Sequence, residues 1–276
     1  MEEHTSNPPT VSDLAGKGHI YAWDGGFALL GKHARPIPVH SHQAIQIVFG
    51  RDADIRLRGS DEEPWRVYSG AIIPTRQPHS LDATAASLTV VLFVEPESNE
   101  GRALTELYLS DGIAPMDLAA NGSADAARLL FTTAIETPGV DFFRPAAWRL
   151  IQALTHGVQP SVVTDERILR AVAYINANLS SDITLDQVAA EAFLSPSRFR
   201  HLFVEQTGMG LRPYVLWRRF LSVWEMLKVG ESLSGAAHSA GFADAAHLTR
   251  TCNRMFGFPP SAIVIQKEPL HSIAEP

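Results

Sequence analysis

Two similar segments near the C-terminus constrain the fold more than any other part of the chain. Each consists of a turn of small residues and a polar helix that ends in Phe followed by Gly, over residues 194–208 and 241–257. This pattern predicts the turn and second helix of a helix-turn-helix, the unit that places one helix in a DNA groove. The chain therefore carries two such predicted units in tandem, between Leu185 and Pro260.

Length and composition indicate a soluble chain of about two domains. The chain has 276 residues, of which 45% are hydrophobic and 19% charged, as is usual for globular proteins. No apolar run reaches the ~18 residues that a membrane span needs, and residues 1–13 are polar and acidic, unlike a signal peptide. The single cysteine, Cys252, excludes an intramolecular disulfide and is expected to be a buried small hydrophobe. A cytoplasmic location with no membrane partner is predicted.

The distribution of charge keeps DNA binding open despite a net charge of −7. Residues 1–164 contain 12 Lys and Arg against 19 Asp and Glu, whereas residues 165–276 contain 11 of each. All the excess acidity therefore lies in the first part. Between residues 194 and 220 there are five arginines and a single acidic residue, Glu205. Because phosphate contact depends on the local patch, the acidic total does not exclude a nucleic-acid binder.

The first part of the chain predicts a small β-barrel or jelly roll. Short runs rich in β-branched and aromatic residues are separated by Gly- and Asp-containing turns. The predicted strands are Ile20–Trp23, Phe27–Leu30, Ala44–Phe49, Asp54–Arg58, Trp65–Tyr68, Ala71–Ile73 and Leu88–Val94.

Helical periodicity then follows over residues 101–109, 123–136 and 141–156. The apolar positions of the last two helices form a candidate dimer surface, with packing on the barrel as the alternative. These positions are Leu129, Leu130, Ile135, Trp148, Ile151 and Leu154.

Two histidine-containing segments resemble the motifs of cupins. The first is the run 38–42 with Gln46 after it, and the second runs from Gly70 to His79. His40, His42 and Gln46 are an even number of residues apart, so a continuous strand would project all three to one face. His79 could complete the set from a facing strand. Metal-binding cupins generally place Glu at the position of Gln46, and a neutral amide is a poorer ligand for a divalent ion than a carboxylate.

Three interpretations of this set remain open. The residues could bind a divalent metal, could line the barrel mouth without a ligand, or could belong to a small-molecule pocket inside the barrel. Trp23, Phe49 and Trp65 are candidates to line such a pocket, with ordinary core positions as the alternative.

The C-terminal part predicts a series of capped helices. Asp165 suits the N-cap of a helix to Leu179, and Thr184 with Gln187 forms a capping box. Ser195 caps the next helix with Pro196 in its first turn. A long helix from residue 212 or 213 to 229 joins the two units, and residues 234–239 form the short first helix of the second unit. Asp244 caps the second reading helix.

Residues from about 168 to 261 resemble the DNA-binding domain of AraC/XylS-type transcription regulators. The resemblance is carried by Leu185, Val188, Ala189, Leu194, Ser195, Phe199, Phe203, Thr207, Gly208, Ala237, Gly241, Phe242, Asp244, Leu248, Phe256, Gly257, Pro260 and Ser261. Many of these regulators place a cupin-like domain first. The implied fold is an α+β two-domain chain, with a cupin-like barrel and flanking helices followed by an all-α domain of two helix-turn-helix units. The implied boundaries are 1–157 for effector sensing and dimerisation, 158–164 for the linker, 165–266 for DNA binding and 267–276 for a tail.

The resemblance also implies which residues approach DNA. These are Ser195, Pro196, Ser197, Arg198, Arg200 and His201 in the first unit, Arg218 and Arg219 on the long helix, and Ala245, Ala246, His247, Thr249, Arg250 and Asn253 in the second unit. Arg200 and Arg250 are the best candidates for guanine, because a guanidinium can bond O6 and N7 together. Arg198, Arg218 and Arg219 are expected to touch phosphate or the protein itself. The alanine pair makes the second unit the weaker expected reader.

The predicted function is a sequence-specific DNA-binding transcription regulator, without enzymatic activity, controlled by a small molecule at the cupin-like domain. The expected partners are double-stranded DNA, RNA polymerase and a second copy of the chain. The prediction favours an activator, although promoter placement decides this rather than any residue. No cofactor is expected, apart from a candidate divalent metal at His40, His42, Gln46 and His79. The alternatives are a metal-binding cupin protein or cupin enzyme with a helical appendage, and an interaction module that has lost DNA reading.

Overall fold

The computed structural model describes residues 18–23, 26–118, 122–136, 139–160 and 164–265. The predictions for residues 1–13, for residues 161–163 of the linker and for the tail 267–276 lie outside these ranges.

The strands of the described residues form two sheets. The larger sheet has the order β10-β7-β4-β9-β2-β1-β11, and the smaller has the order β3-β8-β5-β6. The strands are β1 (Gly18–Trp23), β2 (Gly26–Gly31), β3 (Ile37–His40), β4 (Ile45–Gly50), β5 (Ile55–Arg58), β6 (Arg66–Tyr68), β7 (Gly70–Ile73), β8 (His79–Asp82), β9 (Thr89–Val94), β10 (Ala114–Pro115) and β11 (Ile263–Ile265). A sheet-rich N-terminal part followed by a helical part confirms the predicted fold class.

Each predicted strand overlaps an observed one, but the prediction missed β3, β8, β10 and β11. β3 contains Pro38 and is mostly exposed, and β8 begins with polar residues, so neither has the apolar run that marks a strand in sequence. β10 and β11 are two and three residues long. Such short strands are defined by the strand that they pair with, which a local pattern does not show.

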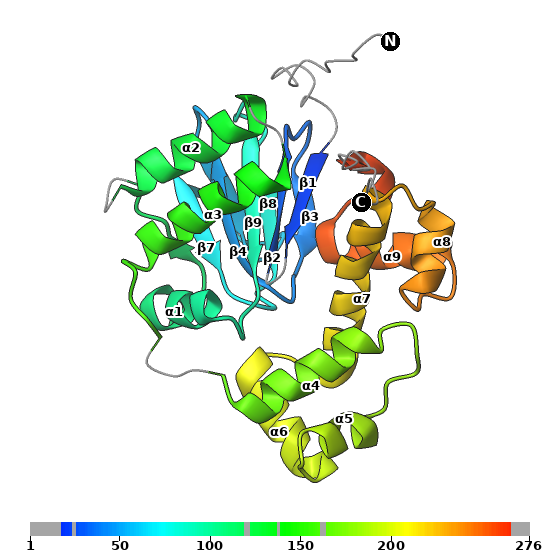
Figure 1. Ribbon diagram of the computed structural model, residues 1–276. Helices are drawn as coiled ribbons and strands as arrows, with labels where there is room; N and C mark the ends of the chain where they lie inside the picture. The colour runs from blue at the N-terminus through cyan, green and yellow to red at the C-terminus, as the bar shows by residue number, and fades with distance from the viewer. Residues whose placement is uncertain (1–17, 24–25, 119–121, 137–138, 161–163, 266–276) are drawn as a thin grey trace, which may run out of the picture.

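Helices α2 (Ser123–Glu136) and α3 (Val140–Leu154) cover one face of the larger sheet, with α1 (Asn99–Tyr108) beside them (Figure 1). Their apolar sides share one core with residues of β1, β2, β4 and β9. Leu130, Ile151 and Leu154 are buried there, so these positions of the candidate dimer surface serve intramolecular packing instead. Phe142 and Trp148 remain 61% and 43% exposed. Dimerisation stays a prediction.

The helical part begins with α4 (Glu166–Ala177), α5 (Leu185–Glu191) and α6 (Pro196–Thr207), followed by the long α7 (Leu211–Lys228). It continues with α8 (Leu233–Ser239), α9 (Ala245–Phe256) and the short η1 (Pro260–Ala262). The predicted caps are present. Asp165 accepts a hydrogen bond from the Arg167 amide, and Thr184 forms the capping box with Gln187. Ser195 and Asp244 cap α6 and α9.

The two helix-turn-helix units are packed in different ways. The first unit, α5–α6, has its own core with α4 and the start of α7, built from residues such as Ile168, Val188 and Phe203. The two sheets pack face to face and are together called the barrel below. The second unit, α8–α9, shares a core with the residues between these sheets. Phe256 at the end of α9 lies 5.6 Å from Phe93 of β9, between ring centroids. Burial of one common apolar cluster attaches the second unit to the sheets.

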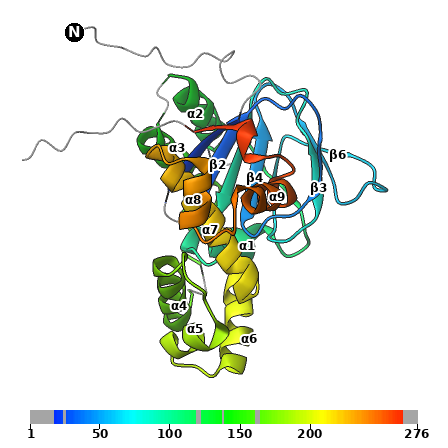
Figure 2. The same cartoon turned by 90° about the vertical axis from the view of Figure 1, so that its right-hand side faces the viewer.

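Both views place α9 beside β3, whereas α4, α5 and α6 lie apart from the sheets at the lower end of α7 (Figures 1 and 2). β11 follows the second unit and pairs in parallel with β1, so the larger sheet includes residues from both ends of the chain. Along the chain, the predicted linker at 158–164 separates the sheet-rich part from the helical part. In packing, the second helix-turn-helix belongs with the barrel, and only the first stands on its own core.

Candidate DNA-reading and effector sites

Helix α6 presents the residues expected to read DNA. Phe199 and Phe203 are buried on its inner side. The exposed side carries Ser195, Pro196, Ser197, Arg198, Arg200 and His201. The ring Nδ1 of His201 lies 2.9 Å from the Ser197 carbonyl oxygen, which turns the other ring nitrogen outward. The helix thus offers two free-standing guanidinium groups and short polar side chains on one solvent-exposed arc.

Helix α9 offers a plainer surface. Ala246, Arg250 and Asn253 are exposed, whereas Ala245, His247 and Thr249 are partly buried. The hydroxyl of Thr249 donates to the Ala245 carbonyl oxygen at 2.8 Å, so it already has a partner within the helix. Of the six residues of α9 predicted to approach DNA, only Arg250 and Asn253 are therefore both polar and exposed.

Two of the residues predicted to contact DNA bond to other parts of the protein. Arg218 forms an ion pair with Glu95 and donates to the Asn176 side chain at 2.7 Å. Arg219 donates to the carbonyl oxygens of Leu179, Gly241 and Ser181. Of the two outcomes expected for these arginines, the structure shows contact with the protein itself, and contact with DNA stays a prediction.

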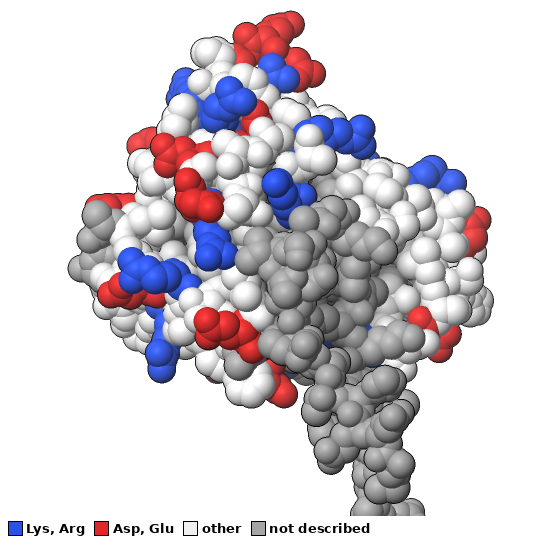
Figure 3. Space-filling model, turned by 90° about the horizontal axis from the view of Figure 1, so that it is seen from above, with Lys and Arg blue, Asp and Glu red and all other residues white. Residues whose placement is uncertain are grey.

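The described surface on the sheet side carries mixed charges. Seen from above, Lys and Arg are interspersed with Asp and Glu (Figure 3). Helix α6 lies at the opposite end of the molecule in Figure 1.

A cavity of about 430 Å³ lies between the barrel and the second helix-turn-helix. Barrel side chains such as Leu29, Val91 and Phe93 line it, and so do Phe256 and Phe258 from the end of α9 and beyond. Its volume is within the range of small-molecule sites. Lys32 and Arg35 are exposed and His33 is half-buried on the loop that borders it.

The aromatic residues predicted to line a barrel pocket lie elsewhere. Trp65 is outside the barrel, where the guanidinium of Arg58 stacks over its ring at 4.6 Å. Phe49 faces α2 and packs edge-on against Phe131. Trp23 packs against the core on the α2–α3 side of the sheet. The prediction missed Phe93 and Phe256, because a pocket shared with the C-terminal unit is not visible in local strand patterns.

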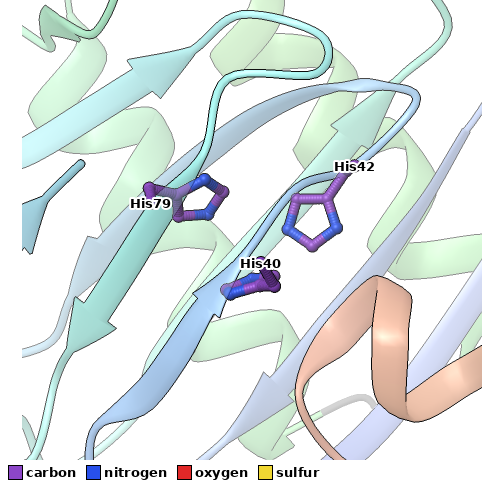
Figure 4. Close-up of side chains that lie close together, drawn as sticks. All are labelled: His40, His42 and His79. Carbon is purple, nitrogen blue, oxygen red and sulfur yellow. The ribbon is translucent and has the colours of Figure 1, made fainter. Parts of the chain in front are cut away.

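A histidine cluster, defined as His40, His42 and His79, adjoins this cavity, and His40 and His42 are among the residues that line it. One nitrogen from each ring lies within 4.8 Å of the others, and the three rings converge (Figure 4). His40 and His79 are paired residues of β3 and β8, as expected for a facing strand. The condition of one continuous strand is not met, because β3 ends at His40 and His42 lies in the connection to β4. Gln46 is buried on β4 and lines the same cavity.

The surroundings of the cluster keep its rings neutral. Burial lowers the pKa of His40, and burial also lowers the pKa of His79 to about 3. Burial lowers the pKa of His42 well below its ordinary value, and the neighbouring histidines lower it further. A hydrogen bond to the main-chain carbonyl of Met255, on α9, opposes this shift. Neutral imidazoles retain the lone pair that a metal ligand needs.

A second polar junction holds the first helix-turn-helix against the barrel. Arg102 of α1 donates to the main-chain and side-chain oxygens of Gln206 at 2.8 and 2.9 Å and to the Thr164 hydroxyl at 3.1 Å. The Tyr214 hydroxyl donates to the buried carboxylate of Glu97. Burial raises the pKa of Glu97, opposed by its bond from Tyr214 and by nearby arginines. No local sequence pattern predicted this junction, because its partners are up to 117 residues apart.

Comparisons with known proteins agree with the helical part of the structure. Residues 188–264 match a helix-turn-helix domain family. Regulatory protein PocR of Salmonella typhimurium is 30% identical over 99 residues, which are 36% of this chain. The chain matches about a third (33%) of the length of that curated relative.

Whole-chain similarity is found among solved structures. ToxT from Vibrio cholerae superposes with a TM-score of 0.56 at 11% identity, covering 89% of this chain and 95% of that one. A structure of ToxT with a bound unsaturated fatty acid has a TM-score of 0.54 at 13% identity and covers 95% and 96% of the two chains. At such identities the likeness establishes the fold. The family match covers the helix-turn-helix part of the chain, and the likeness to ToxT covers both the sheet-rich and the helical parts.

Within the described residues, no helix is both long and apolar enough to cross a membrane.

Proposed function

We propose that this protein is a sequence-specific DNA-binding transcription regulator whose DNA reading is controlled by a small molecule in the cavity between the barrel and α9. The observation that carries the proposal is the shared lining of that cavity. A ligand there touches the barrel and Phe256 of the second helix-turn-helix together, so it has different contacts when the unit is docked and when it is released. A ligand shifts an equilibrium only through such a difference.

DNA reading would be shared unequally between the two units. The exposed arc of α6, with Arg200 at its centre, supports direct base contact, and Arg250 is the corresponding group on α9. Two tandem units that read the same face of DNA reach major-groove segments about 10 base pairs apart. The placement of α9 against the barrel limits which relative positions the two reading helices can adopt.

The cavity favours an apolar molecule with an acidic head group. Its walls include Leu29, Val91 and Phe93, and its rim carries the exposed cations Lys32 and Arg35. ToxT, which shares the fold, has been solved with an unsaturated fatty acid bound. We therefore propose a long-chain carboxylic acid as the chemical class of the effector.

The remaining parts of the proposal rest on the resemblance to AraC-type regulators. They comprise an activating role with contact to RNA polymerase, a homodimer formed through the N-terminal part, a cytoplasmic location and the absence of enzymatic activity.

DNA reading is tested by fluorescence anisotropy on fragments of the region upstream of the gene. We expect a sequence preference, with affinity that falls as salt rises from 50 to 200 mM because phosphate contacts release counterions. Arg200→Ala should cost about 1–3 kcal/mol on the preferred site. Arg144→Ala removes an exposed arginine on α3 and should leave affinity unchanged. Equal affinity for all fragments would refute the proposal.

Effector binding is tested with two probes of equal chain length, cis-9-hexadecenoate and the corresponding alcohol. We expect the acid to bind more tightly, and the double variant Lys32→Ala with Arg35→Ala to weaken the acid at least about tenfold, or 1.4 kcal/mol. Binding of the alcohol should change little in that variant. If acid and alcohol bind equally to both proteins, the acidic class is wrong, and the DNA result stands by itself.

A further inference from the structure

Buried polar atoms in the histidine cluster lack hydrogen-bond partners. His42 Nδ1, His79 Nε2 and Gln46 Oε1 are all buried and make no hydrogen bond of normal geometry among the described residues, although Gln46 lies close enough to His42 to raise the pKa of that ring. His79 is fully buried and Gln46 is 2% exposed. Leaving such atoms unpaired costs free energy, so a group of three in one place requires an explanation.

Main-chain carbonyl groups hold two of the three rings in place. His40 Nδ1 lies 2.8 Å from the Pro38 carbonyl oxygen, and His79 Nδ1 lies 3.0 Å from the Gln77 carbonyl oxygen. When Nδ1 donates to a carbonyl, the lone pair of the ring is on Nε2. Metal-binding histidines are usually oriented in this way, by a carbonyl or carboxylate on the nitrogen that does not bind the ion.

The third ring, that of His42, has its main-chain partner on α9, in the C-terminal part of the chain. His42 bonds to the main-chain carbonyl of Met255 on α9. The ring of His42 also packs 5.2 Å from that of Phe256, between centroids. The orientation of His42 therefore depends on α9 being docked.

The donor set indicates one class of ion. Three neutral imidazoles and one amide oxygen suit divalent transition ions such as Zn²⁺ and Co²⁺, whereas Mg²⁺ and Ca²⁺ prefer sets of oxygen ligands. Bonds from such ions to histidine nitrogen are about 2.0–2.1 Å long. The nitrogens are at most 4.8 Å apart, so small rotations of the rings would bring all three within reach of one ion. The residues present therefore fit a metal of this class.

We propose that His40, His42 and His79, with the amide oxygen of Gln46, bind a divalent transition ion that stabilises the docking of α9 on the barrel. An ion bound to one nitrogen of the His42 ring would leave the proton on the other nitrogen, which could then donate to the Met255 carbonyl. Release of α9 removes that acceptor and frees the ring. By linkage, the ion stabilises the docked state by the same factor by which docking raises affinity for the ion. The proposal requires no DNA binding and can fail or hold independently of the proposed function.

Metal binding is tested on the full-length protein with the ion alone. After dialysis against Zn²⁺ and removal of excess, we expect close to one ion per chain by elemental analysis, and Co²⁺ should give the visible absorption of a low-symmetry site. His79→Ala should lose both signals. His33→Ala removes a histidine from the same cavity but outside the cluster and should keep both. Less than about a tenth of an equivalent in the wild-type protein would overturn the proposal.

His79→Ala could lose the ion simply because it fails to fold, so a second variant is designed to raise the affinity for the ion. Gln46→Glu places a carboxylate in the same position, which offsets the charge of the ion, and should raise Zn²⁺ affinity by about tenfold or more. An unchanged affinity in this variant would place the ion elsewhere and overturn the assignment.

Coupling to docking is tested by hydrogen exchange. With Zn²⁺ bound, the main-chain amides of residues 251–257 should exchange at least about tenfold more slowly than in the presence of a chelator, and the difference should vanish in His79→Ala. Phe256→Ala, which weakens docking, should lower Zn²⁺ affinity by about 10–100-fold, the usual effect of losing an outer partner of a ligand. Phe131→Ala lies in the other core and should not. Equal exchange with and without Zn²⁺ in the wild-type protein would overturn the coupling.

Discussion

Truncation of Phe256 tests whether the second helix-turn-helix shares its core with the barrel. The side chain is 2% exposed. Its ring centroid lies 4.7 Å from that of Phe220 on α7, 5.6 Å from Phe93 on β9 and 5.2 Å from His42. The residue therefore packs against the long helix, the large sheet and the histidine cluster together, and Phe256→Ala should weaken all three attachments.

The magnitude follows from the burial. Replacing a fully buried Phe by Ala costs about 3–5 kcal/mol, since transfer free energy is lost and a cavity remains. Because the loss is concentrated where α9 meets the barrel, we expect it to appear mainly as local opening of residues 233–265. Each 1.4 kcal/mol changes an equilibrium about tenfold. The population of the opened state should thus rise by at least about 100-fold.

The single cysteine provides the assay. Cys252 is fully buried on α9, and burial raises its thiol pKa to about 12. In the opened state the thiol returns to its ordinary pKa and reacts with a disulfide reagent at pH 8, so the labelling rate in native conditions follows the opened population. We expect the rate in Phe256→Ala to exceed that of the wild-type protein at least about 100-fold.

Phe131→Ala is the matched control, because it removes the same side chain from the core under α2. It should leave the Cys252 labelling rate within about twofold, as expected for independent sites. Similar rates in both variants would refute the reasoning, since they would show that Phe256 does not hold the second unit to the barrel.

Three further measurements test other contacts by chemical denaturation. Arg102→Ala removes the charged bonds to Gln206 and should lower the free energy of unfolding by about 1.5–3 kcal/mol, whereas Arg128→Ala, on the exposed side of α2, should lower it by at most about 1 kcal/mol. Asp244→Ala removes the N-cap of α9 and should lower the free energy of unfolding by about 1 kcal/mol, together with a lower helix content at the same temperature. The raised pKa of Cys252 contributes stability that is fully present below a pH of about 8.5 and is lost as pH rises towards 12. Stability between pH 7 and 10 should therefore fall more steeply in the wild-type protein than in Cys252→Ala, and equal slopes would contradict the burial of the thiol.

The paired helix-turn-helix units were predictable because their signals are local. A capping residue such as Asp244 acts on amides three residues away, and inner positions such as Phe199 and Phe203 recur at helical spacing. The sequence therefore placed α4 to α9 within a few residues of their observed bounds. It also predicted that charge would favour α6 over α9 as a reader, and the exposed side chains of the two helices agree with that difference.

The sequence predicted which histidines form the cluster, but the geometry that brings them together differs from the one considered. Equal parity would have aligned His40, His42 and Gln46 along one strand. In the structure β3 ends at His40, and the three residues meet because β3, the following connection and β4 enclose one cavity. The facing position of His79 comes from pairing of β3 with β8, which was not among the predicted strands.

The sequence by itself determined the order of the elements, the capped helices and the identity of the side chains on the α6 surface, because these depend on residues a few positions apart. Only the tertiary structure decided that the second unit packs into the mouth of the barrel. That choice depends on apolar surfaces more than 160 residues apart in the chain, such as Phe93 and Phe256, which lower their free energy by leaving water together. The same packing created the cavity and brought the Met255 carbonyl to His42. The barrel and the second helix-turn-helix, which are separate in sequence, thus share one core.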